Sequence, residues 1–165
     1  MKTRSRQSRG FSLIELMITV VIVAILASIA IPSYNAYVLK SHRTEAKTAL
    51  LDIVSMEERY LSTNAQYTKV AANLGYGAGP ADLTATPMVV GSGYYQVQMP
   101  AGQPVAATVA TAAAAATPAS FSITAVPVPG NMQVNDTACA SFTVTSTGAR
   151  TALNSGGADA TPTCW

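Results

Sequence analysis

The sequence predicts an α+β fold in which one long N-terminal helix packs on a small antiparallel sheet of three to four strands. Residues 11–31 form an apolar run, and a helical stripe of apolar side chains continues from there to about residue 64. Two later segments, 121–126 and 141–145, alternate apolar and hydroxyl side chains, as strands with one solvated face do, and residues 94–99 are a further strand candidate. A helix that covers the apolar face of a sheet is a stable two-layer arrangement, and 165 residues suffice for one such domain with a membrane segment appended.

The apolar run contains a single charged side chain, Glu15. At about 1.5 Å per residue, a helix over 11–31 spans the roughly 30 Å hydrocarbon core of a bilayer. Residues 1–10 carry four basic side chains and no acidic one, which predicts a cytoplasmic N-terminus and a head on the far side of the membrane. A carboxylate within a membrane is costly, so Glu15 is a candidate functional residue that needs a cationic partner.

Three explanations of this N-terminal segment compete. A secretory signal peptide needs a small-x-small cleavage site, and Ser28-Ile29-Ala30 supplies one. A plain membrane anchor explains the length of the run but not Glu15. In the third explanation, the chain is cut after Gly10 and keeps the helix, which leaves six basic and eight acidic side chains, a net charge of 6 − 8 = −2.

The string Gly10-Phe11-Ser12-Leu13-Ile14-Glu15 resembles the class III signal of type IV pilins and related pseudopilins. The resemblance implies that a prepilin peptidase cuts after Gly10 and that the new N-terminus, Phe11, is methylated. It also implies that Glu15 compensates the charged N-terminal amine of a neighbouring subunit. The implied partners are other pilin subunits, the peptidase, an inner-membrane assembly platform and, before assembly, inner-membrane lipid. The implied location is the inner membrane first, with the head in the periplasm, and an extracellular pilus afterwards.

The helix is expected to continue beyond Pro32, which removes a hydrogen-bond donor and predicts a kink at a position where similar pilins also carry proline. Apolar residues then recur at spacings of three and four, which we interpret as a helix face packed on its own domain: Ala46, Ala49, Leu50, Ile53, Met56 and Tyr60. A basic cluster of Lys40, Arg43 and Lys47 follows the membrane boundary. We favour a solvated or intersubunit face, paired with Glu45, Asp52, Glu57 and Glu58, over contact with lipid phosphates or nucleic acid.

The chain after this helix predicts a loop and then a sheet. Glycine and proline punctuate residues 65–93, which indicates a long connecting loop. Strands are expected at 94–99, 121–126 and 141–145, within a sheet region covering 94–150. The Ala/Thr-rich stretch 105–119 is expected to form an irregular or hairpin insertion.

Two cysteines, Cys139 and Cys164, follow a membrane-targeting segment, and this even count predicts one disulfide in an oxidising compartment. Two unrelated buried thiols are the alternative. The turn Thr147-Gly148-Ala149-Arg150 and the final Cys164-Trp165 resemble PilE-like minor pilins of Gram-negative type IV pilus systems. We expect Trp165 to cap an apolar patch beside the disulfide.

The predicted organisation has three parts. Residues 1–10 form a cleaved basic leader, 11–35 a transmembrane and assembly helix, and 36–165 a globular head with the type IV pilin fold. Within the head we expect an amphipathic helix over 36–64, a loop over 65–93, a sheet over 94–150 and a disulfide-bounded C-terminal region over 139–165.

The sequence does not predict an enzyme, a metal site or a cofactor site. Beyond Lys69 the charged side chains are Asp82, Asp136, Arg150 and Asp159, and His42 is the only histidine, so a catalytic set is hard to assemble. The predicted function is a structural subunit of a type IV pilus, more like a minor pilin than a major one, that supports pilus assembly, adhesion and twitching motility. The alternatives are a DNA-binding uptake pilin, which residues 70–165 equip with one cation, Arg150, and a type II secretion pseudopilin.

Overall fold

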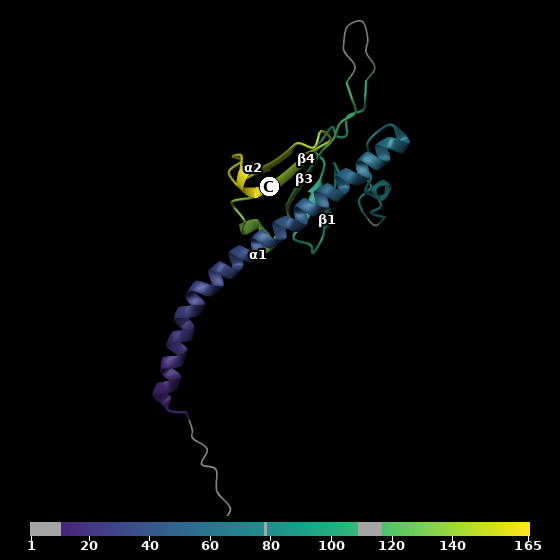
Figure 1. Cartoon of the computed structure of the whole chain (residues 1–165). Helices are drawn as coiled ribbons and strands as arrows, with labels where there is room; N and C mark the ends of the chain where they lie inside the picture. Colours follow the sequence, from purple (N-terminus) through teal and green to yellow (C-terminus); the bar gives the residue numbers. More distant parts are fainter. Residues whose placement is uncertain (1–10, 78, 109–116) are drawn as a thin grey trace, which may run out of the picture. The chain divides into compact units, whose positions relative to one another are not determined.

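The computed structural model describes residues 11–77, 79–108 and 117–165. The chain divides into two compact units, one ending at Val38 and the other running from Leu39 to Trp165. Helix α1 (Leu13–Asn64) contributes to both units (Figure 1). The predicted cleavage residue Gly10 lies outside the described residues.

The first unit consists of the N-terminal part of α1, whose apolar side chains are exposed. The helical assignment continues through Pro32 without interruption, and the expected kink remains a prediction. This part of α1 is long and apolar enough to cross a membrane, and none of its most apolar window is buried. Its apolar surface is therefore available for lipid or for other helices.

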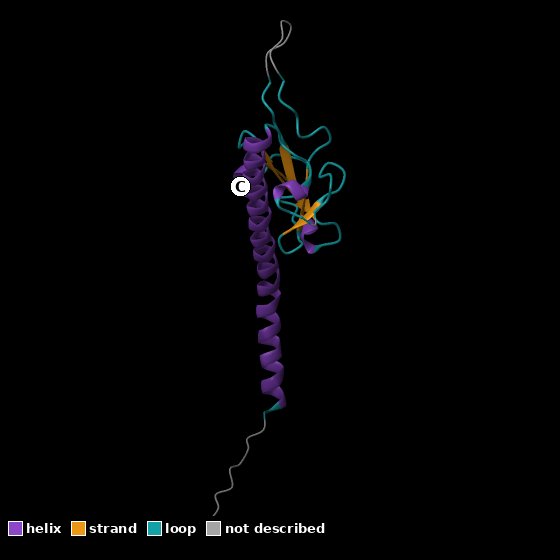
Figure 2. Cartoon of the chain, turned by 90° about the vertical axis from the view of Figure 1, so that its right-hand side faces the viewer, coloured by secondary structure: helices purple, strands orange, loops and turns teal. Residues whose placement is uncertain are grey.

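The second unit pairs the C-terminal part of α1 with a sheet of five antiparallel strands, which confirms the predicted α+β class (Figure 2). Neighbouring strands follow chain order: β1 (Met88–Val90), β2 (Tyr95–Gln98), β3 (Ser122–Pro127), β4 (Ser141–Thr145) and β5 (Arg150–Leu153). The predicted count of three to four strands was therefore too low. The two extra strands form the two edges of the sheet, and each is only three or four residues long.

One buried row of side chains crosses the whole sheet and faces the helix. Met88, Val97, Ala125, Phe142 and Ala152 pair in register from β1 to β5, and each is buried. The row on the opposite face is polar and consists of Gln98, Thr124, Thr143 and Thr151. The alternation that predicted the strands thus assigns the apolar row to the core, against the buried helix residues Ala46, Leu50 and Ile53.

Short elements fill the connections. The predicted loop over 65–93 contains the 3-10 helix η1 (Ala71–Leu74) as well as β1, so that prediction was wrong in part. A second 3-10 helix, η2 (Met132–Asn135), precedes β4, and helix α2 (Thr161–Cys164) follows β5. In the Ala/Thr-rich stretch, antiparallel bridges join Val105 to Ser120 and Thr108 to Thr117, and 109–116 lie outside the described residues.

Candidate functional site

The N-terminal residues singled out by the sequence lie at the start of α1. Phe11 is 77% exposed, and the backbone N–H groups of Glu15 and Leu16 both donate to the Ser12 carbonyl in the first turn. Glu15 is exposed, and no cation among residues 11–77, 79–108 and 117–165 forms an ion pair with it. A carboxylate in the first turn interacts favourably with the helix dipole, but within lipid it still needs an opposite charge.

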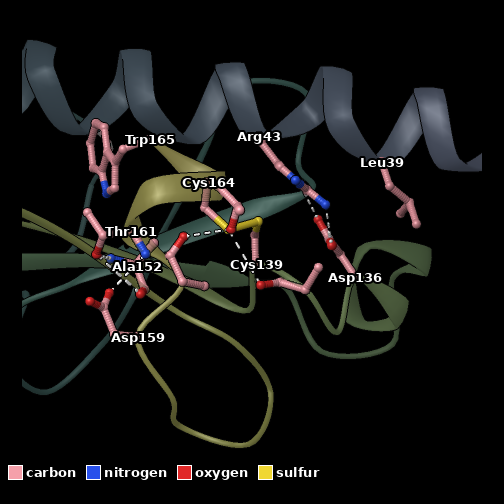
Figure 3. The surroundings of a disulfide bond; sticks show 12 residues. Leu39, Arg43, Asp136, Cys139, Ala152, Asp159, Thr161, Cys164 and Trp165 are labelled. Atoms are coloured by element: carbon pink, nitrogen blue, oxygen red, sulfur yellow. Dashed lines mark hydrogen bonds and ion pairs between the residues drawn. A yellow bond between two sulfur atoms is a disulfide. The ribbon is translucent and has the colours of Figure 1, made fainter.

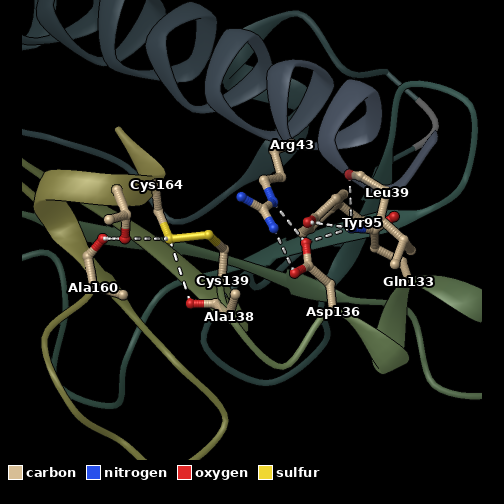
Figure 4. Close-up of polar contacts among 10 residues, drawn as sticks. Leu39, Arg43, Tyr95, Gln133, Asp136, Ala138, Cys139, Ala160 and Cys164 are labelled. Atoms are coloured by element: carbon tan, nitrogen blue, oxygen red, sulfur yellow. Dashed lines mark hydrogen bonds and ion pairs between the residues drawn. A yellow bond between two sulfur atoms is a disulfide. The ribbon is translucent and has the colours of Figure 1, made fainter. Parts of the chain in front are cut away.

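Within the second unit, a buried ion pair joins the C-terminal part of α1 to the residue that follows η2. Arg43 Nε and Nη2 donate to the two Asp136 carboxylate oxygens at 2.7 and 2.8 Å, and the Asp136 side chain is only 3% exposed (Figure 4). Because both partners are bidentate and mostly desolvated, the pair has the geometry that a buried charge requires. The predicted pairing of Arg43 with acidic neighbours on its own helix was wrong, since its partner lies 93 residues away.

Gln133 on η2 completes this contact. Its amide nitrogen donates to the Leu39 carbonyl of α1 at 3.2 Å, to the Tyr95 hydroxyl at 2.9 Å and to Asp136 at 3.1 Å. Asn131 precedes η2 and caps it, accepting from the Gln133 backbone N–H. We call Arg43, Gln133 and Asp136 the helix clamp, because together they join η2 to the first helical turns of the second unit.

The C-terminal region packs against the edge of the sheet, next to the helix clamp. Cys139 and Cys164 form the predicted disulfide, and both are buried (Figure 3). The Trp165 indole N–H donates to the Thr151 carbonyl at 2.7 Å, and its ring meets the Phe142 ring edge-on at 6.0 Å. Trp165 therefore caps the apolar core beside the disulfide, as the sequence predicted.

Two further cations, Arg150 and Lys47, lie over the rings of Trp165 and Phe142. The Arg150 guanidinium lies 5.4 Å from the Trp165 ring, and the Lys47 ammonium lies 5.9 Å from the Phe142 ring beneath it. Burial, with the positive charges of Arg43 and Lys40 nearby, holds the pKa of Lys47 below its usual value. We call Lys40, Lys47, Arg150 and Trp165 the basic flank of the head.

Glu57 was expected on a solvated or intersubunit face, but it is a buried carboxyl, so this prediction was wrong. Its side chain is fully buried, Oε2 accepts from the Thr68 backbone N–H at 3.0 Å, and Oε1 has no hydrogen-bond partner among the described residues. Burial raises the pKa of Glu57 to about 7, and the neighbouring Glu58 charge adds to the effect.

The helix clamp was not recognised from the sequence. The one available signal was Asp136, an isolated carboxylate in a half of the chain with few charges, but no spacing connects it to Arg43. The other residues predicted to act, Phe11 and Glu15, belong to the first unit, whereas the helix clamp belongs to the second. The described parts of the chain contain no cluster of three or more side chains suited to a metal ion.

Comparisons with known proteins match two family models to this chain. Residues 32–143 match the family described as type IV minor pilin ComP, DNA uptake sequence receptor. Residues 5–31 match the prokaryotic N-terminal methylation motif, over the segment that contains Gly10, Phe11 and Glu15.

Individual relatives include major subunits of type IV pili. The chain is 40% identical over 70 residues to the type IV major pilin protein PilA of Myxococcus xanthus, covering 42% of this chain and 32% of that protein. It is 38% identical over 82 residues to the type IV wide pilus major component PilA4 of Thermus thermophilus, covering 48% and 63%. It is 42% identical over 64 residues to the type IV major fimbrial protein FimA of Dichelobacter nodosus, covering 32% and 40%. The matched segments thus span from about a third to under two thirds of these relatives.

Proposed function

Because this chain belongs to the type IV minor pilin family, we propose that it is a structural subunit of a type IV pilus, whose exposed N-terminal helix bundles with those of other subunits in the filament. It is a structural protein rather than an enzyme. In this account the precursor is anchored in the membrane by α1, and the subunit ends in an extracellular filament that supports adhesion and twitching motility.

One observation carries the proposal: the apolar side chains of residues 11–31 are exposed along the helix, with Glu15 as their one charged neighbour. Val20, Ile25 and Ile29, for example, are 57%, 58% and 69% exposed. Burying such side chains between subunits stabilises an assembly by about 25 cal/mol per Å² of apolar surface. The same burial takes Glu15 away from water, so assembly needs a cation at that depth.

Leader removal supplies that cation. Cleavage after Gly10 creates an amine on Phe11, and in a filament this amine faces Glu15 of an adjacent subunit. Methylation of the amine keeps its charge. In this proposal a prepilin peptidase performs the cut, an inner-membrane platform inserts the subunit, and the basic leader keeps the N-terminus cytoplasmic.

Replacement of Glu15 tests this function. We expect Glu15→Ala to be inserted and cleaved normally but to be present in sheared pili at a level at least about tenfold lower, because the Phe11 amine would be buried unpaired. Ser28→Ala is the matched control, since the Ser28 hydroxyl donates to Ile25 of its own helix and has no predicted role between subunits. Normal incorporation of Glu15→Ala would refute the proposal.

A second candidate function is DNA uptake, which the description of the matched family favours. The basic flank would supply the contacts, with Lys47 and Arg150 on phosphates and Trp165 beside a base or sugar. A gel shift of the head, residues 36–165, at increasing salt tests this candidate. Binding that weakens with salt and with Arg150→Ala would support it, and an absence of any shift at low salt would exclude it.

A further inference from the structure

Between residues 40 and 52, α1 carries opposite charges on its two flanks. At 100° per residue, Lys40, Arg43 and Lys47 fall on one side of the buried stripe of α1, whereas Glu45 and Asp52 fall on the other. Contacts from both sides agree with this division. Arg43 reaches η2, which leads into β4, whereas Glu45 accepts from the Ser92 hydroxyl at 3.1 Å, in the turn between β1 and β2.

A groove lies along the acidic side, between α1 and the edge strand β1. It has a volume of about 750 Å³, with Ala49 and Val89 among the apolar residues that line it and Glu45 and Asp52 among its polar ones. Val89 is 55% exposed although it belongs to a strand of the sheet. We call this the acidic groove.

The carboxylates of the groove are held in place. The Tyr76 hydroxyl donates to Asp52 at 2.7 Å, and no cation pairs with Asp52 among the described residues. Glu45 packs against Gly91, where φ is +57° and an added Cβ would lie 3.0 Å from Glu45 Oε2, so both the backbone and the space favour glycine there. Glu45 Oε1 also lies 3.5 Å from His42 Nδ1, a contact that is an ion pair only when the histidine is protonated. With Asp52 unpaired among the described residues, the groove presents negative charge beside an apolar surface.

The basic flank has the complementary chemistry. Lys40, Lys47 and Arg150 form no ion pair with any acid among the described residues. Arg150 stacks over the partly exposed Trp165 ring, which gives one apolar group with a cation above it. Aromatic and arginine side chains of this kind are the residues that most often dominate protein interfaces.

We propose that the basic flank of one subunit docks into the acidic groove of a second copy of this chain. Trp165 and Arg150 would cover the apolar surface at Val89, and Lys47 and Arg150 would lie near Asp52 and Glu45. The two surfaces lie on opposite sides of α1, so the contact is heterologous and leaves a free surface on each copy. Such contacts extend into an open polymer instead of closing as a dimer.

A second copy of the chain is a better partner for the basic flank than nucleic acid is. Nucleic-acid affinity depends on many phosphate contacts, whereas this flank offers three cations without acidic partners among the described residues. A groove with apolar lining and two carboxylates repels phosphate and suits a cationic, aromatic surface. The proposal rests on the chain being a pilus subunit, and the wild-type level in sheared pili tests that premise separately.

Charge reversal in cells that assemble pili tests the contact. We expect Lys47→Glu and Asp52→Lys each to lower the amount of the chain in sheared pili by at least about threefold, relative to its level in the membrane. The double variant Lys47→Glu/Asp52→Lys should return to within about twofold of wild type. Absence of the wild-type chain from pili would overturn the proposed function. A double variant that is incorporated into pili no better than the single variants would overturn the proposed docking.

A second double variant is the matched control. Lys47→Glu/Glu58→Lys has the same net charge as the first double variant, but Glu58 lies on the same side of α1 as Lys47, so it should not restore incorporation. The Glu58→Lys single variant is measured beside it, because Glu58 accepts a hydrogen bond from the Tyr67 hydroxyl. Equal rescue by both double variants would mean that net charge matters rather than the contact, and would overturn the proposal.

Cysteine cross-linking gives an independent readout. A chain carrying both Asp52→Cys and Arg150→Cys should form covalent oligomers in oxidised pili, whereas each single-cysteine chain should stay monomeric. Dimers from Arg150→Cys alone would show that the basic flanks face each other, against the proposal. Full-length protein in a salt-dependent gel shift completes the test, since DNA binding that Lys47→Glu abolishes while pilus incorporation stays normal would assign the flank to DNA instead.

Discussion

Glu57 predicts an unusual pH dependence of the head. Its pKa rises from 4.5 in the unfolded chain to about 7 in the folded one, chiefly because the carboxyl is buried. Between these values the folded state keeps a proton that the unfolded state has released, so stability falls as pH rises from 4.5 to 7 and then levels off. At about 1.36 kcal/mol per pH unit, the loss is roughly 3 kcal/mol.

Urea unfolding of the head, residues 36–165, measures this effect, since its buried core lies entirely within 46–164. We expect the free energy of unfolding to drop by roughly 3 kcal/mol between pH 5 and pH 8 in the wild type, and Glu57→Gln to remove that part of the drop. The slope is the relevant quantity, because a buried glutamine amide without an acceptor costs about 1–3 kcal/mol at every pH.

Glu58→Gln is the matched control for this experiment. Glu58 is the next residue, it accepts from the Tyr67 hydroxyl at 2.8 Å, and a glutamine carbonyl can still accept that bond. Its variant should therefore keep most of the wild-type dependence on pH and lose only the smaller share that the Glu58 charge adds to the pKa of Glu57. A Glu57→Gln head that loses stability with pH as steeply as the wild type would refute the assignment of this dependence to Glu57.

Two further predictions concern the stability of the same head. Reduction of the disulfide, or Cys139→Ser with Cys164→Ser, should lower the free energy of unfolding by about 3.5 kcal/mol on the chain-entropy estimate for a separation of 25 residues, measured as a lower urea midpoint. An unchanged midpoint would mean that the disulfide constrains nothing. Arg43→Ala should cost about 3–5 kcal/mol, because Asp136 stays buried without its partner. Lys69→Ala breaks a pair that is largely exposed to solvent and should cost much less, so equal losses in the two variants would contradict the role of the helix clamp.

The sequence predicted the architecture because its strongest patterns are local. The apolar run, the helical stripe and the three strand candidates each occur within one element, and all of them lie in the expected elements. The edge strands were missed for the same reason. Met88–Val90 is too short for alternation to show, and Arg150–Leu153 has one buried position, Ala152.

The parts of the candidate site that depend on tertiary contacts could not be predicted. Arg43 and Asp136 are 93 residues apart, and no periodicity connects them. Glu57 occupies the core position four residues after Ile53, but a carboxylate there hides the apolar pattern that would have marked it as buried. Local patterns thus identified the helix and the strands, whereas charges buried by distant contacts needed the fold.

Cleavage after Gly10 creates the amine that Glu15 needs in the proposed filament, and mass spectrometry of the N-terminal peptide from sheared pili detects that cleavage. Our account predicts a peptide that begins at Phe11 and carries a methyl group on its amine. A mature chain that begins at Ile31, as cleavage by a secretory signal peptidase would leave it, or one that retains residues 1–10, would contradict the account.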